Sequence, residues 1–296
     1  MSCRKISPER ITIMAADGRK LSARWWQGAK AFERSIIFIP ALAAPQAYLK
    51  CFADYLAQQG WGIITFDYRG IGASKDDRLD SCVTIDDWIN LDIPAAVSEV
   101  KRRTETHFLG AIAHSVGGQL LGQSPVRQYI DGVLFISSQR GTPKLFKGMA
   151  RLRIHYAYLI FPILIYIFDQ LPVSKWTLPQ DCPSQVLLQW IRWGRTGVLT
   201  NKEGENVESR FAEYEGPLIT ITIADDLDYA SAASVEALAA LYLGANIRRE
   251  KIVPQDYGLD TIGHFGFFHR RAPLSLWSQT EEWLKQLHSE AALAKF

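Results

Sequence analysis

Short apolar runs alternate with amphipathic segments along most of the chain. Runs rich in β-branched or aromatic residues, bounded by turn residues, predict strands at 10–14, 21–26, 35–40, 61–67, 107–113, 132–138, 217–225 and 249–253. Apolar positions at helical spacing predict helices at 47–59, 84–103, from 116 onward, 232–243 and 273–287. Strands that alternate with helices predict an α/β fold, with a mostly parallel central sheet flanked by helices on both faces.

Turn and breaker residues refine this pattern. Asp17-Gly18 separates the first two strands and is a strong hairpin signal. Gly60 is placed to cap the C-terminus of the first helix. Pro94 lies inside the segment 84–103 and predicts a kink or a break there.

The alternation stops between about residue 139 and residue 215, where Pro, Trp and Tyr are frequent. This segment lies between the sixth and seventh predicted strands. An insertion at the carboxyl end of a strand would overhang the place where open α/β sheets bind ligands. We therefore predict a core made of residues 1–138 and 216–296, with a helical cap or lid at 139–215.

One stretch of this insertion, IHYAYLIFPILIYIF (154–168), is apolar almost all round. It is shorter than the roughly 18 residues that suggest a membrane span, and Pro162 interrupts it. Trp190 and Trp193 are spaced to share a helix face. The insertion fits a small satellite core, an apolar wall around an acyl chain, or contact with a bilayer surface. We expect packing, combined with an acyl pocket, ahead of peripheral membrane contact.

Composition narrows the classes of partner. The 296 residues carry a net charge of +2 without a clustered basic excess, so a nucleic-acid partner is not expected. The cysteines are scattered without a CxxC pair, which disfavours a zinc site and favours reduced thiols in a cytoplasmic protein. They are Cys3, Cys51, Cys82 and Cys182. The first 14 residues lack the apolar core of a signal peptide.

The segment AHSVGG (113–118) directly follows a predicted strand and opens a predicted helix. A nucleophile in that place needs small residues two positions away on each side, because larger side chains would clash with the strand and the helix. Gly117 meets this need, and Ala113 stands where the usual pattern has Gly. The helix N-terminus favours developing negative charge near Ser115. The alternative is that Ser115 only caps the helix.

A histidine must take the serine proton and return it to the leaving group. His264 in IGHFGFF follows the last strand between two glycines, as in a loop that reaches over a site. His269 precedes two arginines and is expected to be solvated. His114 is beside Ser115, so its side chain is expected to point away and to be packed or hydrogen-bonded.

An acid at a strand end can orient that histidine. Asp225, Asp226 and Asp228 all follow the strand at 217–225, and the position counted from the start of the strand favours Asp226, with Asp228 in reserve. The chain order Ser115, Asp226, His264 is that of α/β-hydrolases.

The chain resembles an α/β-hydrolase fold serine hydrolase and is similar to bacterial members near the lysophospholipase and serine-aminopeptidase-like branch. The likeness is carried by residues 39–74, AHSVGG, the strand before Asp226 and IGHFGFF. It implies an oxyanion hole made by the backbone N–H groups of Leu42 and Val116, although Pro40-Ala41 replaces the His-Gly of many relatives. FDYRGIGAS resembles the DxRGxGxS turn of this fold, where a structural role is expected for Asp67, Arg69 and Ser74.

These features predict a serine hydrolase that cleaves a carboxylic ester with an acyl or otherwise apolar portion, through an acyl-enzyme. The sequence offers neither a phosphate-binding Gly-rich loop nor a cluster of metal ligands, so no cofactor or metal is expected. Amide or peptide hydrolysis and acyl transfer would use the same residues. A non-catalytic binding protein of the same fold is the other alternative, supported by Ala113 and Pro40-Ala41. The expected partner is a small-molecule ester or acyl substrate, with peripheral membrane contact through 154–168 as a further alternative.

Overall fold

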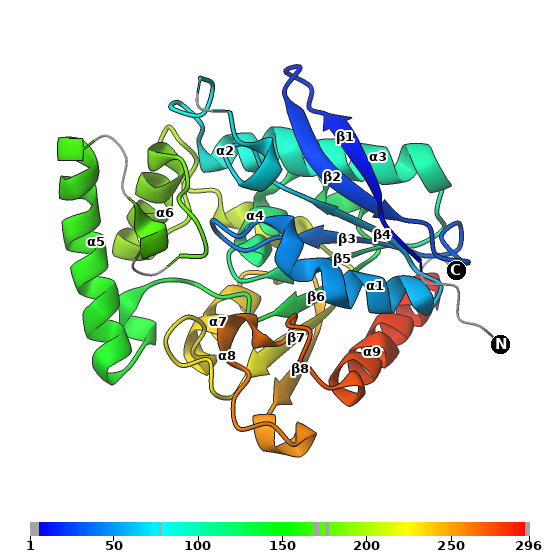
Figure 1. Cartoon of the computed structure of the whole chain (residues 1–296). Helices are drawn as coiled ribbons and strands as arrows, with labels where there is room; N and C mark the ends of the chain where they lie inside the picture. The colour runs from blue at the N-terminus through cyan, green and yellow to red at the C-terminus, as the bar shows by residue number, and fades with distance from the viewer. Residues whose placement is uncertain (1–5, 77, 169–171, 176–177, 294–296) are drawn as a thin grey trace.

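The computed structural model describes residues 6–76, 78–168, 172–175 and 178–293 (Figure 1). Cys3 lies outside this part of the chain. The described strands form one eight-stranded sheet in the order β1-β2-β4-β3-β5-β6-β7-β8. They are β1 (Glu9–Met14), β2 (Lys20–Trp26), β3 (Ser35–Ile39), β4 (Gly62–Phe66), β5 (Leu109–His114), β6 (Gly132–Ile136), β7 (Pro217–Ile223) and β8 (Asn246–Ile252).

The sheet is mostly parallel, as the alternation of strands and helices predicts. β1 and β2 form the expected antiparallel hairpin, with Gly18 in the turn at a φ of +82°. β2 also pairs antiparallel with β4, whereas the six strands from β4 to β8 in the sheet order pair parallel with one another. The carboxyl ends of the parallel strands therefore meet at one edge of the sheet, and the loops that follow β3, β5, β6 and β7 lie there together.

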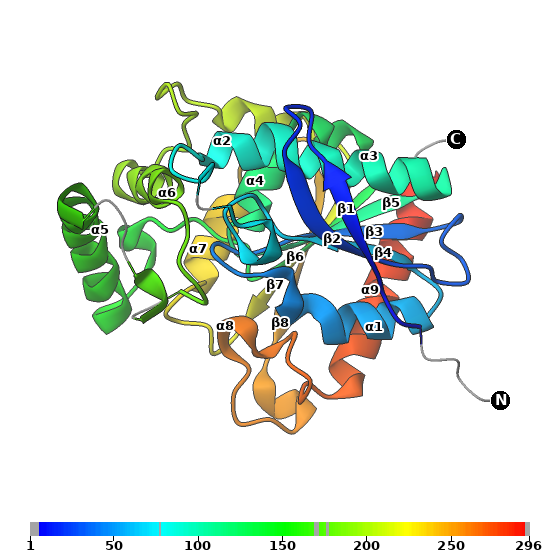
Figure 2. The same ribbon diagram turned by 45° about the horizontal axis from the view of Figure 1, so that its top comes forward.

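Helices cover both faces of the sheet, as Figures 1 and 2 show. On one face, α1 (Lys50–Gln58) and α9 (Leu274–Leu293) bury apolar residues such as Phe52 and Leu284. On the other, α3 (Ile93–Thr104), α4 (Gly117–Gln123) and α7 (Ala232–Ala239) bury residues such as Val100 and Leu120. The remaining core helices are α2 (Ile85–Asp87), α8 (Gly263–Gly266) and the short segments η1 (Gln46–Leu49), η2 (Gly72–Ser74), η3 (Trp88–Asp92), η4 (Pro125–Tyr129) and η8 (Pro254–Tyr257).

The helix predicted at 84–103 continues past Pro94, where a kink or a break was expected, but its winding changes just before this proline. It consists of α2, the π-helical turn η3 and α3, which has Pro94 in its first turn. Proline lacks the N–H that would bond to the carbonyl four residues earlier, and its ring crowds that carbonyl. A π turn next to Pro94 absorbs both effects without ending the helix.

The chain between β6 and β7 contains α5 (Gly148–Phe168), α6 (Ser184–Thr196) and the short segments η5 (Pro143–Leu145), η6 (Val173–Lys175) and η7 (Glu208–Glu213). α5 and α6 lie side by side at one end of the molecule (Figures 1 and 2). Tyr158 and Ile165 of α5 pack against Leu187 and Ile191 of α6 in a small separate cluster. A Cβ at Gly194 would lie 2.1 Å from the Tyr158 ring, so glycine permits this close approach.

The sequence-based view of the apolar run 154–168 is wrong in two respects. α5 begins earlier, at Gly148, and its 21 residues continue through Pro162. By length and composition alone it could cross a membrane. A proline removes one N–H and crowds one carbonyl, which bends or weakens a helix more readily than it ends one when the residues on both sides favour helix.

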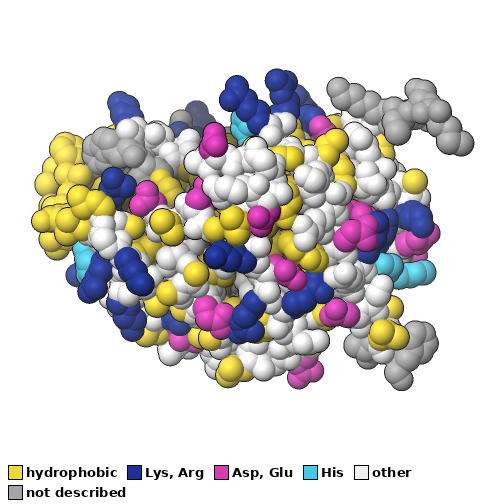
Figure 3. Space-filling view, turned by 90° about the horizontal axis from the view of Figure 1, so that it is seen from below, with side chains coloured by type: hydrophobic (Ala, Val, Ile, Leu, Met, Phe, Trp, Pro, Cys, Tyr) yellow, Lys and Arg dark blue, Asp and Glu magenta, His cyan; other side chains and the backbone are white. Residues whose placement is uncertain are grey.

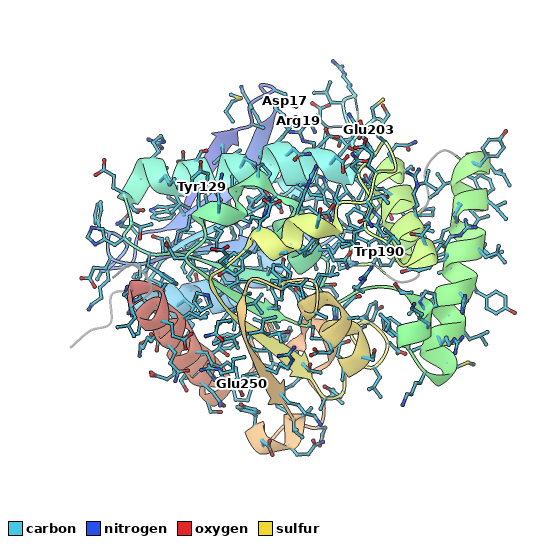
Figure 4. The ribbon with its side chains drawn as sticks, turned by 180° about the vertical axis from the view of Figure 1, so that it is seen from behind. Asp17, Arg19, Tyr129, Trp190, Glu203 and Glu250 are labelled. Carbon is cyan, nitrogen blue, oxygen red and sulfur yellow. The ribbon has the colours of Figure 1, made fainter. Side chains whose placement is uncertain are left out.

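The turn after β4 is held by buried polar contacts. Asp67 accepts hydrogen bonds from the backbone N–H groups of Gln46 (2.6 Å) and Ala73 (3.1 Å). The Ser74 hydroxyl donates to the carbonyl of Asp67 at 2.8 Å. Arg69 bonds to Asp92, and also to Asp17 in the hairpin turn whose tip is labelled in Figure 4. These contacts fit the structural role expected for Asp67, Arg69 and Ser74.

Candidate active site

Ser115 lies on a tight turn between β5 and α4. Its φ is +56°, in the left-handed region that non-glycine residues rarely adopt, and its exposed fraction is 8%. Such strain persists only where the surroundings enforce it, and it concentrates at functional sites. The turn therefore has the conformation that a nucleophile at this place requires.

The residues around Ser115 explain how the turn closes. A Cβ at Gly117 would lie 2.4 Å from the carbonyl oxygen of Ile39, so only glycine fits against β3. A Cβ at Gly118 would lie 2.8 Å from Cβ of Ser138. Ala113 is fully buried in β5, in register with Ile39 and Phe135 on the neighbouring strands. The methyl of Ala113 is thus accommodated while Ser115 keeps its positive φ.

Of the three neighbouring carboxylates, Asp226 contacts His264. The distance from Nδ1 of His264 to Oδ2 of Asp226 is 2.6 Å, and the exposed fractions of the two residues are 7% and 2%. A carboxylate can only accept, so Nδ1 carries the proton and Nε2 is left as the acceptor in the neutral ring. This is the tautomer that a general base needs.

The other two carboxylates have different partners. Asp225 accepts hydrogen bonds from the N–H groups of Ile262 (2.8 Å) and Gly263 (3.0 Å), and so holds the loop that carries His264. Asp228, the reserve choice from the sequence, forms an exposed ion pair with Arg153 of α5 at 3.3 Å. The role of Asp225 was missed in the sequence because a carboxylate that binds backbone N–H groups leaves no side-chain pattern.

Aromatic rings surround His264. The Tyr229 ring stacks on it, with centroids 5.0 Å apart and an interplanar angle of 23°. The His114 ring lies 4.6 Å away, and its Nε2 is 2.9 Å from the carbonyl oxygen of His264. His114 is therefore packed and hydrogen-bonded, as expected. His269 is exposed, with its Nδ1 accepting a bond from the N–H of Arg271.

The backbone groups predicted for an oxyanion hole lie beside Ser115. Leu42 follows β3, Val116 follows Ser115, and both line the same cavity as Ser115 and His264. Within the described residues neither the Leu42 N–H nor the Val116 N–H donates to a protein acceptor. The neighbouring N–H of Ala41 does, to the hydroxyl of Tyr48 at 3.2 Å. The N–H of Ala41 is thus hydrogen-bonded, whereas the N–H groups of Leu42 and Val116 can donate to a ligand.

The cavity has a volume of about 700 Å³ and mainly apolar walls. The segment between β6 and β7 supplies much of its lining, including Leu152, Tyr156 and Phe161 of α5 and Trp190 of α6. Figure 4 shows Trp190 on the inner side of α6, where its ring packs edge-on against Tyr158 at 5.3 Å. A cavity of this size suits a small-molecule ligand with a large apolar part.

The chain resembles known proteins in sequence and in fold. Residues 35–166 match the family model described as serine aminopeptidase, S33. The fold aligns with an esterase of Pyrococcus furiosus (18% identity, TM-score 0.62, covering 96% of this chain and 92% of that one). It also aligns with a soluble variant of monoglyceride lipase from Saccharomyces cerevisiae, solved in complex with a substrate analogue (14% identity, TM-score 0.67, 97% of each chain).

A third similar structure is Est1E from Butyrivibrio proteoclasticus with ferulic acid bound (16% identity, TM-score 0.61, covering 94% of this chain and 99% of that one). No curated protein sequence matches the chain. The family match spans the strands and the turn that carry Ser115, and the shared fold spans nearly the whole chain. The chain therefore has the α/β-hydrolase fold.

Proposed function

We propose that this protein of α/β-hydrolase fold is a serine hydrolase that cleaves a carboxylic ester with an apolar acyl portion. The observation that carries the proposal is the 2.6 Å contact between Asp226 and His264, at a cavity that Ser115 also lines from a strained turn. Ser115 and His264 line one cavity and Asp226 contacts His264, and nucleophilic acyl transfer uses a serine, a histidine and an acid in these roles. A site that only bound a ligand would not need this arrangement.

In the proposed mechanism, Nε2 of His264 takes the proton of Ser115 as its hydroxyl oxygen attacks the ester carbonyl. The N–H groups of Leu42 and Val116 hold the oxyanion of the tetrahedral intermediate. His264, now charged and stabilised by Asp226, gives its proton to the leaving alkoxide, and an acyl-enzyme remains. Water, deprotonated by His264, attacks this ester, and Ser115 leaves with its proton restored and the acid released.

We propose that the segment 139–215 acts as a cap that shapes the acyl site. Its helices supply the apolar wall of the cavity, and this favours an extended apolar group over a small polar one. The similarity to an esterase and to a monoglyceride lipase supports an ester substrate. Amide or peptide hydrolysis and acyl transfer stay alternatives, because they use the same residues.

A fluorophosphonate probe and a series of p-nitrophenyl esters from acetate to dodecanoate test this function. We expect the probe to label the wild type on Ser115, and kcat/KM to rise with acyl length. Ser115→Ala should abolish both, while Ser278→Ala, at an exposed serine of α9, should change neither. Folded wild-type protein that takes no label would contradict the proposal and favour a non-catalytic binding protein.

A second function is favoured by the bare outer side of α5: we propose that it rests on a lipid surface. Only 11% of its most apolar 18-residue window is buried. Figure 3 shows hydrophobic side chains gathered at the end of the molecule where α5 lies. Four exposed apolar residues of α5 do not line the cavity and recur at helical spacing: Leu159, Ile163, Tyr166 and Ile167.

Charge supports a lipid partner over a second copy of the chain. Lys144, Lys147 and Arg151 are exposed just before and at the start of α5, and cations beside an apolar helix face favour an anionic leaflet. The same helix lines the cavity, so an acyl substrate could pass from the leaflet to Ser115. Because α5 is packed against α6, we propose that it lies on the surface and does not cross it.

Co-sedimentation with vesicles containing phosphatidylserine tests the lipid contact. We expect the wild type to bind and the double variant Leu159→Glu/Ile163→Glu to stay in solution. Leu293→Glu, which also charges an exposed leucine but on α9, is the matched control and should bind like the wild type. Lipid docking would be contradicted if the wild type did not bind the vesicles. It would also be contradicted if the wild type formed a dimer and the double variant were monomeric.

We likewise propose that the protein is cytoplasmic, as its cysteines predict. Cys51, Cys82 and Cys182 are free thiols, which is consistent with a reducing compartment.

A further inference from the structure

A chain of hydrogen bonds connects the loop after β3 with the loop that carries His264. The N–H of Ala41 is 3.2 Å from the hydroxyl oxygen of Tyr48, which is 3.1 Å from Nδ1 of His114. Nε2 of His114 is 2.9 Å from the carbonyl oxygen of His264. His114 is also the residue directly before Ser115, so the chain reaches three loops of the candidate active site.

The two ends of this chain determine where its protons lie. A backbone N–H can only donate, so Ala41 donates to Tyr48. A backbone carbonyl can only accept, so Nε2 of His114 carries a proton and donates to His264. Nδ1 of neutral His114 must then accept, and the Tyr48 hydroxyl donates to it. With His114 neutral, this arrangement of protons satisfies all three contacts.

Burial keeps His114 in that neutral form. It is 1% exposed, and burial, followed by the nearby charge of His264, holds its pKa well below the usual value. The described titratable groups that contact its ring are Tyr48 and His264, and the remaining ring contacts are to Phe265 and Phe268. A neutral ring 4.6 Å from His264 adds no repulsion when His264 gains a proton during the reaction.

The same residues pack as a unit. Tyr48 makes edge contacts with Phe265 and Phe268, at centroid distances of 5.6 and 5.3 Å. His114 contacts the same two phenylalanines at 5.2 and 4.9 Å. The loop of His264 is therefore held by ring contacts and by one polar contact on its carbonyl, both made by residues of η1 and β5.

We propose that Tyr48 and His114 are positioning residues that set the distance between the oxyanion N–H groups and His264. The inference rests on the proposed function for its kinetic consequence, but the hydrogen-bond chain stands without it. By engaging Ala41, Tyr48 orients the next peptide, so that the Leu42 N–H points to the cavity. By bonding to the His264 carbonyl, His114 keeps Nδ1 of His264 on Asp226 and Nε2 of His264 toward Ser115.

Four variants separate positioning from ordinary packing. Tyr48→Phe removes the hydroxyl and keeps the ring, and His114→Phe removes both polar contacts. His114→Gln keeps an amide N–H that can reach the His264 carbonyl. Tyr214→Phe is the matched control, because this buried hydroxyl also bonds to the backbone, at the carbonyl of Pro217, but away from the cavity.

We expect Tyr48→Phe to lower kcat by roughly tenfold and His114→Phe by roughly a hundredfold, with KM within about twofold, because misplaced groups cost transition-state stabilisation. His114→Gln should recover about tenfold of the loss in His114→Phe. Tyr214→Phe should keep the wild-type kcat even if its Tm falls by a similar amount. A loss of kcat that follows Tm across all four variants would overturn the proposal.

Proton NMR of the Nδ1–H of His264 gives a readout that does not depend on turnover. Its resonance should lie far downfield in the wild type and shift in Tyr48→Phe and His114→Phe, but not in Tyr214→Phe. An unchanged resonance together with a kcat within twofold of the wild type would overturn the inference. Absent labelling of the wild type by fluorophosphonate, with the NMR shifts as expected, would instead overturn only the proposed hydrolase activity.

Discussion

Asp225, Asp226 and Asp228 lie within four residues of one another, yet each should respond differently to substitution. Asp226 contacts Nδ1 of His264 at 2.6 Å, Asp225 accepts two backbone N–H groups, and Asp228 pairs with Arg153 in solvent. Replacing each with Asn changes the charge by the same amount and the volume hardly at all. Differences among the three variants therefore report their partners rather than the loss of a carboxylate.

The structure sets the expected magnitudes. For Asp226→Asn, an amide beside Nδ1 favours the wrong tautomer of His264, and such a change costs about 10⁴ in kcat, or about 5.4 kcal/mol of transition-state stabilisation. For Asp225→Asn, the amide oxygen still accepts from Ile262 and Gly263 but without the negative charge, so the two bonds weaken by about half. We expect a loss of roughly threefold to tenfold in kcat, because His264 becomes less well held.

Asp228→Asn should leave kcat within about twofold of the wild type. The side chains of this ion pair are 56% and 68% exposed, and exposed pairs contribute about 0–1 kcal/mol. The assay is the hydrolysis of p-nitrophenyl octanoate at pH 8, with the rate of fluorophosphonate labelling as a second measurement and urea unfolding as a control for folding. Equal losses in Asp226→Asn and Asp228→Asn, or more than a tenth of the wild-type kcat in Asp226→Asn, would refute the reasoning.

Three further predictions follow from buried groups near the turn at Ser115. Gly117→Ala should destabilise the protein by about 1–3 kcal/mol and lower fluorophosphonate labelling, because its methyl would overlap the carbonyl of Ile39; equal labelling and urea midpoint would contradict this. Ala113→Gly should leave kcat within twofold of the wild type, since Ser115 already has its positive φ with Ala113 in place. Glycine in a strand should lower the free energy of unfolding by about 0.5–1 kcal/mol, measured with urea. A large gain in kcat would show that the methyl strains the turn. The pKa of His114 is lowered on folding, so its contribution to stability is present above pH 6.5 and is lost as pH falls toward the folded pKa, at up to about 1.4 kcal/mol per pH unit. Urea unfolding at pH 7.5 and 5.5 should therefore show a smaller loss of stability in His114→Gln than in the wild type. Equal losses in the two proteins would contradict the burial argument.

Much of the fold could be predicted from the chain alone. Parallel strands buried on both faces are nearly continuous apolar runs, and this is why segments such as 35–40 and 132–138 could be identified with little ambiguity. The order of Ser115, Asp226 and His264 after separate strands then suggested which loops meet at one edge of the sheet. The effect of Pro94 was also predictable, because it acts on its own helix.

The insertion was harder to predict for a physical reason. A helix that is apolar all round has no polar stripe to show which side is buried, so the sequence could not tell a satellite core from a wall of the cavity or an exposed face. In the structure α5 combines all three, with Tyr158 and Ile165 buried, Phe161 at the cavity and Tyr166 in solvent. The continuation through Pro162 likewise depended on the residues before and after it.

Taken by itself, the sequence determined the strands and most of the helices and indicated the proposed class of chemistry, since these follow from patterns within a few residues. The tertiary structure alone decided which carboxylate contacts His264 and that His114 and Tyr48 join two loops. Asp226 and His264 are separated by 38 residues, and His114 and His264 by 150. Contacts at such separations depend on how loops from different strands pack at the edge of the sheet, and local propensity carries no information about that packing.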